Sequence, residues 1–492
     1  MDKVRLTLAV ALAIALPFAR SHGAEQKWLR AVTPNFELYT TGSEGVARDA
    51  ILYFERVRAF FISATNTKKP PQKVTRIIGF RSEKEYSRYR PNEAAKAYYQ
   101  SGPLGDCIVM QSLGGDFYPV AVHEYTHSML QNSGLKLPPW LEEGMAELYA
   151  TVKFVGSGAR MGDIPPGHHA YLLREKWLDL PTLVAVGPDS PHYNKPELMP
   201  MFYAQSLALT HMLMLGDDYR SRFTALLGAI GNSQETAAAI DNVYGRSLVQ
   251  VEKDLQSYVR GISFKALLFS FGLEKTAERP EIRPATPLES GLALAGLFAN
   301  RRGKEEESRL AYAKLAAEYP QSWRPEAGLA YLALRTARDQ AGRHFARAEE
   351  LGSDDANMYF DYAMSGTPES GKRQAELLQK AVKLKPDFEE ANYYLGFALY
   401  VLRDCQGAHD ALTRVKRITS EQAPQFFQVL AYSDDCLGLP DLAKAAAKQA
   451  LDFARTPADS DWARQFLEYV NRPRGGEGAV RPDAPQPEEE RR

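Results

Sequence analysis

The sequence is poor in the features that mark several large classes of protein. It has only three cysteines in 492 residues, so its fold is not a scaffold built from disulfides. Its formal net charge is −1, which lacks the basic surplus that a nucleic-acid-binding protein needs to neutralise phosphates. Beyond its first residues it has no apolar stretch of the roughly 20 residues that span a bilayer. We therefore expect no nucleic-acid partner and no membrane span in the mature chain.

In its overall composition the chain is typical of a globular protein. Hydrophobic residues make up 45% of the chain and charged residues 25%. The length exceeds what one hydrophobic core supports, so we expect two or more domains.

The N-terminus has the pattern of a secretory signal peptide, which we place at residues 1–24. Lys3 and Arg5 precede an apolar run from Leu6 to Phe18, and the small residues of 21–24 suit a signal peptidase. An uncleaved membrane anchor is the alternative. The cleavage site has no cysteine, which argues against a bacterial lipoprotein. The sequence thus predicts a periplasmic or secreted protein.

The section from 25 to 265 is expected to form a domain with a small sheet followed by a mainly helical part. Alternating and β-branched runs predict strands, and spacings of three and four predict helices. We expect strands at 28–39, 74–80 and 107–110, and helices at 46–61 and from Ser82, where Glu85 completes a capping-box pattern. From Tyr118 to about Arg260 the pattern is helical, except for an irregular covering loop with one short helix at 163–197. The fold class is therefore α+β.

The second half of the chain has a repeating helical pattern. A charged, proline-bearing stretch at 266–287 is expected to be a linker. Residues 288–470 then show helix punctuation with a period of 33, because Pro320 and Pro386 lie two such periods apart. That period resembles the tetratricopeptide repeat (TPR), which implies an all-α solenoid of about five units. Cys405 and Cys436 occupy equivalent places in neighbouring repeats, and the sequence leaves open whether they pair. We expect a disordered tail at 471–492.

The candidate catalytic motif is His123-Glu124-Tyr125-Thr126-His127, an HExxH pattern. Residues four apart share one face of a helix, so both imidazoles can bind one Zn²⁺ ion. Glu124 lies beside the first histidine but is rotated around the helix, which suits a general base acting on a water at the metal. Apolar neighbours on both sides of the motif give its helix a face to bury.

A catalytic zinc site usually has three protein ligands, and the third should come from a neighbouring helix. Gly134 is placed to end the motif helix, and Pro138-Pro139 is placed to begin the next one. That next helix contains two carboxylates four residues apart, Glu143 and Glu147. One can bind the metal while the other accepts the free ring N–H of a histidine. Glu142 is expected to point elsewhere, into solvent.

With these residues the resemblance to a family becomes specific. HEYTH followed by WLEEGMAE resembles the gluzincin metallopeptidases, and the span from Trp28 to about Arg260 resembles their peptidase MA-like members. The resemblance implies a zincin-type catalytic domain with Glu143 as the ligand, which leaves Glu147 to accept the free ring N–H of a histidine. It also implies that a later tyrosine, here Tyr203, stabilises the oxyanion. Where the family has asparagine before the glutamate ligand, this sequence has Glu142.

Several other residues admit two interpretations. Without the family pattern, Tyr203 is an aromatic of a helix core. His211 shares its helix and is expected to be structural. His168 and His169 are expected at the surface, with lining of the cleft as the alternative, and His192 carries no signal. The strand at 108–110 is either an ordinary core strand or a sheet edge that binds an extended substrate.

The expected function is therefore that of an exported metallopeptidase with one Zn²⁺ ion and a protein or peptide substrate. The repeats are expected to bind the substrate or a protein partner. The alternative is a non-catalytic envelope scaffold, in which the repeats recruit proteins and the zinc site is structural or vestigial. A structural site would need a fourth protein ligand, and neither of the nearest candidates, Glu147 and the distant Cys107, has a spacing that suits this role.

Overall fold

The computed structural model describes residues 27–65, 74–93, 95–102, 105–133, 135–156, 158–261, 264–270, 279–299, 301 and 303–472. The chain divides into two compact units, the first extending to Thr286 and the second from Pro287, with residues 100–106 assigned to the second. The predicted signal peptide at 1–24, Gly134 and all but the first two residues of the predicted tail lie outside the described residues. Within the described ranges, no helix is long and apolar enough to cross a membrane.

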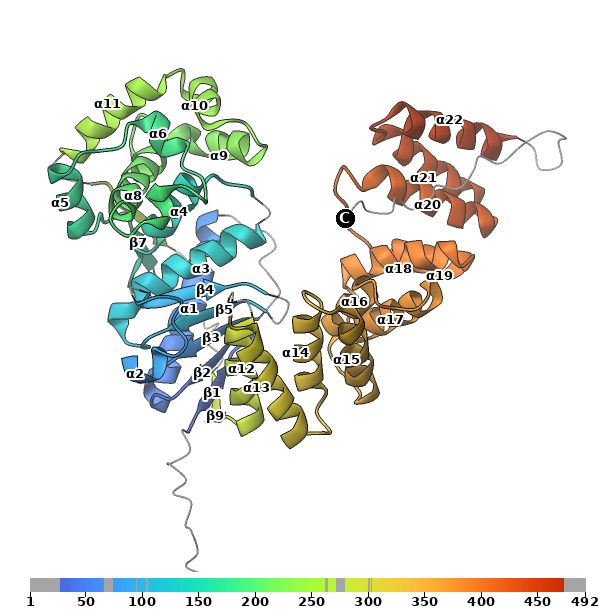
Figure 1. Cartoon of the computed structure of the whole chain (residues 1–492). Helices are drawn as coiled ribbons and strands as arrows, with labels where there is room; N and C mark the ends of the chain where they lie inside the picture. The colour runs from blue at the N-terminus through green and yellow to red at the C-terminus, as the bar shows by residue number, and fades with distance from the viewer. Residues whose placement is uncertain are drawn as a thin grey trace, which may run out of the picture. The chain divides into compact units, whose positions relative to one another are not determined.

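The first unit contains a six-stranded sheet (Figure 1). Its strands are β1 (Leu29–Val32), β2 (Phe36–Thr40), β3 (Thr75–Gly79), β4 (Ala97–Gln100), β5 (Cys107–Met110) and β9 (Glu281–Pro284), in the order β4-β5-β3-β2-β1-β9. β2, β3 and β5 are parallel, whereas β1 is antiparallel to both of its neighbours. The predicted strand at 28–39 is in fact two strands. They are separated by a turn in which the Thr33 amide donates to the Phe36 carbonyl at 3.0 Å.

Two further strands differ from the expectation. β4 was not predicted, and it forms the edge of the sheet, so that β5 lies inside the sheet between β4 and β3. Ile108, Val109 and Met110 are fully buried; the strand at 108–110 is therefore a core strand, and the edge interpretation does not apply to it. β8 (Leu267–Ser270) and β9 lie within the predicted linker at 266–287, where they pair with β7 (Gly158–Met161) and β1 of the first unit.

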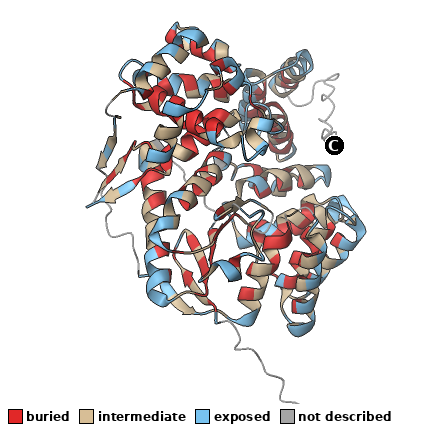
Figure 2. Ribbon diagram, turned by 60° about the vertical axis from the view of Figure 1, so that its left-hand side comes forward, coloured by how far each residue is buried: buried red, intermediate tan, exposed pale blue. Residues whose placement is uncertain are grey.

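Helices α1 (Glu44–Thr65) and α3 (Tyr118–Asn132) pack their apolar faces into the core of the first unit. The rings of Phe54 on α1 and Tyr125 on α3 both contact Phe36 of β2, with centroid separations of 5.8 and 5.6 Å. Figure 2 shows buried positions along the strands and on the inward sides of the helices. α2 (Glu83–Tyr86) begins as predicted, with the Ser82 hydroxyl accepting from the Glu85 amide. α3 is thus fixed through its apolar face.

The remainder of the first unit is mainly helical. Its further elements are η1 (Gly115–Phe117), α4 (Pro139–Tyr149), β6 (Lys153–Val155), β7 (Gly158–Met161), α5 (Pro166–Arg174), α6 (Leu180–Val184), α7 (Pro191–Asn194), α8 (Met199–Leu215), η2 (Arg220–Arg222), α9 (Phe223–Gly231), α10 (Thr236–Tyr244) and α11 (Leu248–Val259). β6, β7 and β8 form a separate three-stranded sheet. The covering segment, residues 163–197, contains three short helices rather than one. Prolines start each of them, because the first turn of a helix tolerates a missing N–H.

The second unit consists of helices that pack in consecutive pairs (Figure 1). The pairs in the described residues are α12 (Pro287–Ala299) with α13 (Glu305–Glu318), α14 (Trp323–Ala333) with α15 (Arg338–Glu350), α16 (Ala356–Met364) with α17 (Gly371–Leu384), α18 (Glu389–Val401) with α19 (Cys405–Leu412), and α20 (Ala423–Cys436) with α21 (Pro440–Asp452), followed by α22 (Pro457–Asn471). α14, α16, α18 and α20 begin 33 or 34 residues apart. The period inferred from the prolines is therefore confirmed.

The two cysteines of the repeats form a disulfide. Cys405 begins α19 and Cys436 ends α20, so the two do not occupy equivalent places in their repeats, contrary to the expectation. Their Cα atoms are 6.2 Å apart. This settles the pairing that the sequence left open. Cys107 is buried, and its thiol is not part of a disulfide.

Candidate metal centre

His123 and His127 lie in the middle of α3, one turn apart and on the same face. Ala121, Val122 and Tyr125 of the same helix are buried in the core, which determines the side from which the two imidazoles project. The side chains of His123 and His127 are only 14% and 13% exposed. The apolar residues that flank the motif thus orient its polar residues.

α4 supplies the third side chain, and its own packing fixes where that side chain lies. Trp140 is fully buried, and its indole N–H donates to the Thr236 hydroxyl at 3.3 Å. Gly144 lies directly against α8. A Cβ atom on Gly144 would lie 2.1 Å from the Thr210 hydroxyl and 2.4 Å from the Ser206 carbonyl oxygen. Only glycine allows α4 to pack this closely against α8. The close packing determines the position of the adjacent Glu143.

Three ligand atoms converge from these two helices. The Nε2 atoms of His123 and His127 are 3.1 Å apart. Oε2 of Glu143 lies 3.2 Å from Nε2 of His123 and 3.6 Å from Nε2 of His127. Ligands about 2.0–2.1 Å from a tetrahedral zinc ion lie about 3.3–3.4 Å from one another. The three predicted ligands are therefore brought together at spacings that suit such an ion.

The same carboxylate oxygen is left without a well-directed hydrogen bond. The Glu143 side chain is 3% exposed, and its Oε2 atom is buried with no hydrogen-bond partner among the described residues. A buried carboxylate oxygen needs a compensating positive charge, which either protonated imidazoles or a cation held between it and the imidazoles would supply. This chemistry, with two imidazoles and one carboxylate, fits Zn²⁺.

Each histidine also has a carboxylate behind it. Nδ1 of His123 lies 3.4 Å from Oε1 of Glu147, as the sequence predicted. Nδ1 of His127 lies 3.1 Å from Oε1 of Glu142. The expectation that Glu142 points into solvent is thus wrong, because α4 directs it at the second histidine. Carboxylates in these positions hold each ring with Nε2 directed inward.

These contacts shift the pKa values of the cluster in opposite directions. Burial by itself would raise the pKa of Glu143, but the contacts with His123 and His127 lower it well below its ordinary range. Burial lowers the pKa of His127, yet Glu142 and Glu143 outweigh it and raise that pKa to about 10. The pKa of His123 is raised in the same way, by Glu143 and Glu147 against burial. A metal ion bound there would have to displace the proton of the His127 imidazole.

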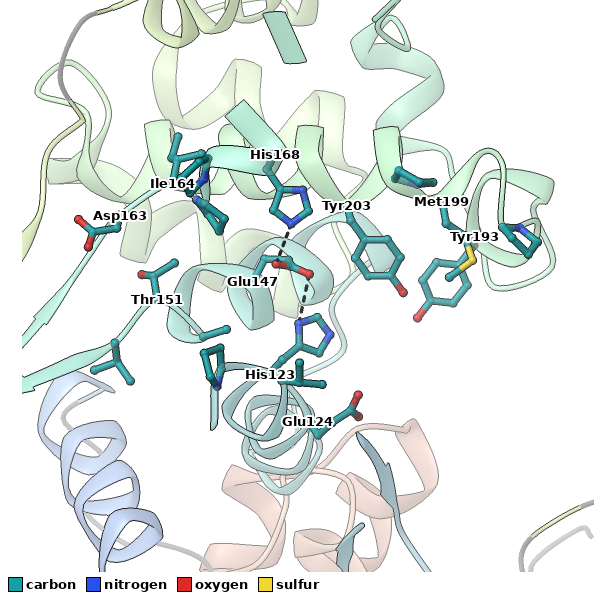
Figure 3. A pocket seen from close by; sticks show the side chains of 18 of the residues that line it. His123, Glu124, Glu147, Thr151, Asp163, Ile164, His168, Tyr193, Met199 and Tyr203 are labelled. Atoms are coloured by element: carbon teal, nitrogen blue, oxygen red, sulfur yellow. Dashed lines mark ion pairs between the residues drawn. The ribbon is translucent and has the colours of Figure 1, made fainter. Parts of the chain in front are cut away.

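Glu124, the predicted base, lies beside the cluster with one of its oxygens engaged. Its Oε2 atom accepts a hydrogen bond from the backbone amide of Tyr99 on β4, at 2.9 Å. Burial raises the pKa of Glu124, although His123, His127 and the Tyr99 amide act in the opposite direction. In Figure 3 its carboxylate stands apart from the contact between His123 and Glu147. The Tyr99 amide thus fixes one carboxylate oxygen of Glu124 beside the cluster.

Two tyrosines face the same carboxylate, and only one of them was predicted. Tyr203 on α8 lies with its ring centroid 6.2 Å from that of His123. Tyr193 on α7 donates a hydrogen bond from its hydroxyl to Oε1 of Glu143 at 2.6 Å. Burial, followed by the charge of Glu143, raises the pKa of both phenols far above their ordinary value. Both are therefore protonated donors. Tyr193 was not predicted, because a single tyrosine in a short helix gives no periodic pattern in the sequence.

The other histidines have distinct places. His168 on α5 lies 3.4 Å from Oε2 of Glu147 and so belongs to the cleft rather than to the surface. His169 bonds the Val259 carbonyl at 3.0 Å. His211 is fully buried between the Tyr258 hydroxyl and the Gly162 carbonyl, each at 2.8 Å, which is the structural role expected. Within the part of the chain that the structure describes, the His192 side chain makes no contact with the centre.

The cluster opens into a cleft of about 1340 Å³ within the first unit (Figure 3). His123, Glu124, Glu147, His168, Tyr193 and Tyr203 line it together with Ile164, Met199 and five prolines, namely Pro119, Pro165, Pro166, Pro196 and Pro200. A large cleft with mostly apolar walls and a few convergent polar groups is typical of a binding site.

Comparison with known proteins returns no family model and no curated protein that matches this chain. Solved structures with some likeness include YrrB, described as a TPR protein with an unusual peptide-binding site. It is 17% identical over 36% of this chain and 90% of its own, with a TM-score of 0.29. MamA is 17% identical over 33% of this chain and 92% of its own, with a TM-score of 0.27. PilF of Pseudomonas aeruginosa is 16% identical over 37% and 83%, with a TM-score of 0.27.

Proposed function

We propose that the first unit is a zinc-dependent metallopeptidase of the gluzincin type, with His123, His127 and Glu143 as metal ligands. The observation that carries the proposal is the convergence of three ligand atoms at mutual distances of 3.1, 3.2 and 3.6 Å. The buried oxygen of Glu143 and the Glu124 carboxylate at the same cleft support it. Among the described residues, the group suited to metal binding comprises these three and no fourth. A three-ligand set favours catalysis over a structural site.

Zn²⁺ bound there would act as a Lewis acid and make a water molecule more acidic. Glu124 accepts a proton from the attacking water at Oε1, because its Oε2 is held by the Tyr99 amide. The water oxygen bonds to the carbonyl carbon of the peptide, and Tyr203 donates a hydrogen bond to the carbonyl oxygen as negative charge develops there. Glu124 then passes the proton to the leaving nitrogen as the C–N bond breaks.

The cleft also indicates which class of substrate the enzyme binds. β4 is the edge strand of its sheet, and Tyr99 on this strand contacts the catalytic base directly. An extended peptide can add to such an edge through backbone hydrogen bonds. The apolar walls, including Ile164 and Met199, suit apolar side chains next to the cleaved bond. We therefore propose an extended, unfolded stretch of protein as the substrate class.

The helix pairs of the second unit would bind the substrate or a protein partner, since stacked repeats present extended binding surfaces. The Cys405–Cys436 disulfide supports an oxidising compartment, where such bonds persist. We accordingly propose that the protein acts in the periplasm or outside the cell.

The test is a pair of variants of the full chain without residues 1–24, assayed on a peptide library with zinc content measured in parallel. Glu124→Gln should keep stoichiometric zinc and lose at least about a hundredfold in kcat/KM, because a positioned base contributes roughly 10²–10⁴. His127→Ala should lose both zinc and activity. Glu175→Gln, which alters an exposed carboxylate on the covering segment, is the matched control and should leave both unchanged.

The outcome separates the enzyme from a binding protein with a structural or vestigial metal site. If purified protein with one equivalent of zinc cleaves no member of the library, or if Glu124→Gln cleaves as fast as the parent, the peptidase proposal is wrong. Zinc binding without hydrolysis would then assign the chain to the scaffold class.

A further inference from the structure

The two oxygens of Glu143 have different partners. Oε2 faces the imidazoles of His123 and His127, whereas Oε1 accepts the hydroxyl of Tyr193 at 2.6 Å. A hydrogen bond this short from a neutral donor to a carboxylate is among the stronger ones that proteins form. It fixes the rotation of the carboxylate about its last bond, so that one oxygen alone is presented to the imidazoles.

The geometry around Tyr193 makes it a rigid donor. α7 has only four residues, but the Ser190 hydroxyl caps it by accepting from the His192 amide. The Asn194 side chain donates to the Ser190 carbonyl at 3.0 Å, which ties the end of the helix to its start. The Tyr193 ring packs edge-on against Phe202 of α8, with centroids 5.6 Å apart at 88°. The phenol is therefore held in place before any metal binds.

The covering segment that carries Tyr193 is anchored to α8. Gln205, two residues after Tyr203, is fully buried and bonds Leu178 twice. Its Oε1 atom accepts the Leu178 amide at 2.9 Å, and its Nε2 atom donates to the Leu178 carbonyl at 2.7 Å. The same segment places His168 against Glu147. It thus contacts two carboxylates of α4, Glu143 and Glu147.

We infer that Tyr193 is a positioning residue, which holds Glu143 as a single-oxygen metal ligand through the hydrogen bond from its hydroxyl to Oε1. The inference rests on the proposed metal centre but goes beyond it, because it assigns to the covering segment a part in metal retention. A carboxylate released from Tyr193 can rotate and offer both oxygens to the ion. That would fill the coordination place that a substrate or water needs.

The test compares Tyr193→Phe with Tyr171→Phe in the full chain. Tyr171 is a partly buried tyrosine on α5 of the same segment, and its hydroxyl has no hydrogen bond within the described residues. Both variants lose one phenolic oxygen, and only in Tyr193→Phe is that oxygen one that contacts Glu143. Zn²⁺ affinity is measured by competition with a chromophoric chelator, and coordination by the visible absorption of the Co²⁺-substituted protein. These readouts need no substrate.

Tyr193→Phe should bind Zn²⁺ about tenfold to a hundredfold more weakly, the usual effect of removing a residue that holds a metal ligand. Its Co²⁺ absorption should weaken as the coordination number rises. Tyr171→Phe should match the parent in both measurements. If Tyr193→Phe does not fold, Ser190→Ala replaces it, since it removes the cap of α7 but keeps the phenol, and it should show a smaller loss of affinity.

Unchanged affinity and absorption in Tyr193→Phe would overturn the inference, whatever happened to hydrolysis. A fall in kcat alone would overturn it too, because it would assign the phenol to the substrate instead. A parent protein that binds no Zn²⁺ would overturn both this inference and the proposed function. A parent that binds Zn²⁺ normally while the variant matches it would leave the proposed function standing.

Discussion

Replacing Gly144 by alanine should disturb the metal centre through packing alone. The new Cβ atom would lie 2.1 Å from the Thr210 hydroxyl and 2.4 Å from the Ser206 carbonyl oxygen. Ordinary contacts need about 3.4 Å or more, so α4 must move away from α8 by on the order of 1 Å. Overpacking of this kind costs roughly 1–3 kcal/mol of the free energy of unfolding. Because Glu143 is the adjacent residue, its carboxylate moves with the helix.

Two measurements on the same protein test this prediction. The free energy of unfolding, from urea denaturation in the presence of a chelator, should fall by about 1–3 kcal/mol in Gly144→Ala. Zinc affinity should fall as well, since a displaced ligand no longer matches the two imidazoles. Truncating Thr210 to alanine in the same chain should restore only part of each, because the Ser206 clash is with backbone.

The matched control for Gly144→Ala is Gly228→Ala. Gly228 lies inside α9, exposed, and a Cβ atom there would have no neighbour within 4 Å. Alanine at this position should stabilise the protein by roughly 0.5–1 kcal/mol, from helix propensity, and leave zinc affinity unchanged. A Gly144→Ala protein that matched the parent in stability and in zinc affinity would refute the reasoning that α8 sets the depth of Glu143.

Two further predictions concern Glu142 and His211. Glu142→Gln keeps an acceptor for Nδ1 of His127 but removes its charge, so zinc affinity should fall, by up to about tenfold in the same chelator competition; equal affinity would mean that this carboxylate has no part in the centre. Burial lowers the pKa of His211, so the unfolded chain takes up a proton near pH 6.5 and the folded chain does not. The contribution of neutral His211 to the free energy of unfolding is therefore complete above about pH 6.5. Below that pH the contribution is lost, and the free energy of unfolding falls by up to about 1.4 kcal/mol per pH unit. Urea denaturation from pH 7.5 to 5 should show a steeper loss of stability in the parent than in His211→Gln, and parallel curves would contradict this.

Local sequence signals predicted the parts of the fold that depend on local interactions. The HExxH spacing placed His123 and His127 on one helix face, and the prolines at 138–139 marked the start of α4. The repeat period followed from Pro320 and Pro386, since each repeat is one short-range unit. Such features are determined within one or two helical turns, or within one repeat.

What the sequence did not predict depends on contacts between distant segments. β9 becomes a strand because it pairs with β1, about 250 residues earlier, and its own residues, Glu281–Pro284, have the composition of a linker. β4 is four residues long and only half buried, so its pattern is too short to detect. Tyr193 lies 50 residues beyond the carboxylate it binds. None of these long-range pairings produces a periodic pattern in the local sequence.

The misplacement of Glu142 shows how α4 organises the whole centre. An α-helix turns about 100° per residue, so carboxylates at positions 142, 143 and 147 spread over about 140° of one side, with Glu143 between the other two. The outer pair therefore reaches the Nδ1 atoms of His127 and His123, while Glu143 reaches between their Nε2 atoms. In the sequence alone, Glu142 has the pattern of a charged side chain that is exposed to solvent. Considered with its two neighbours, it completes a set in which each imidazole has its own carboxylate and both share a third.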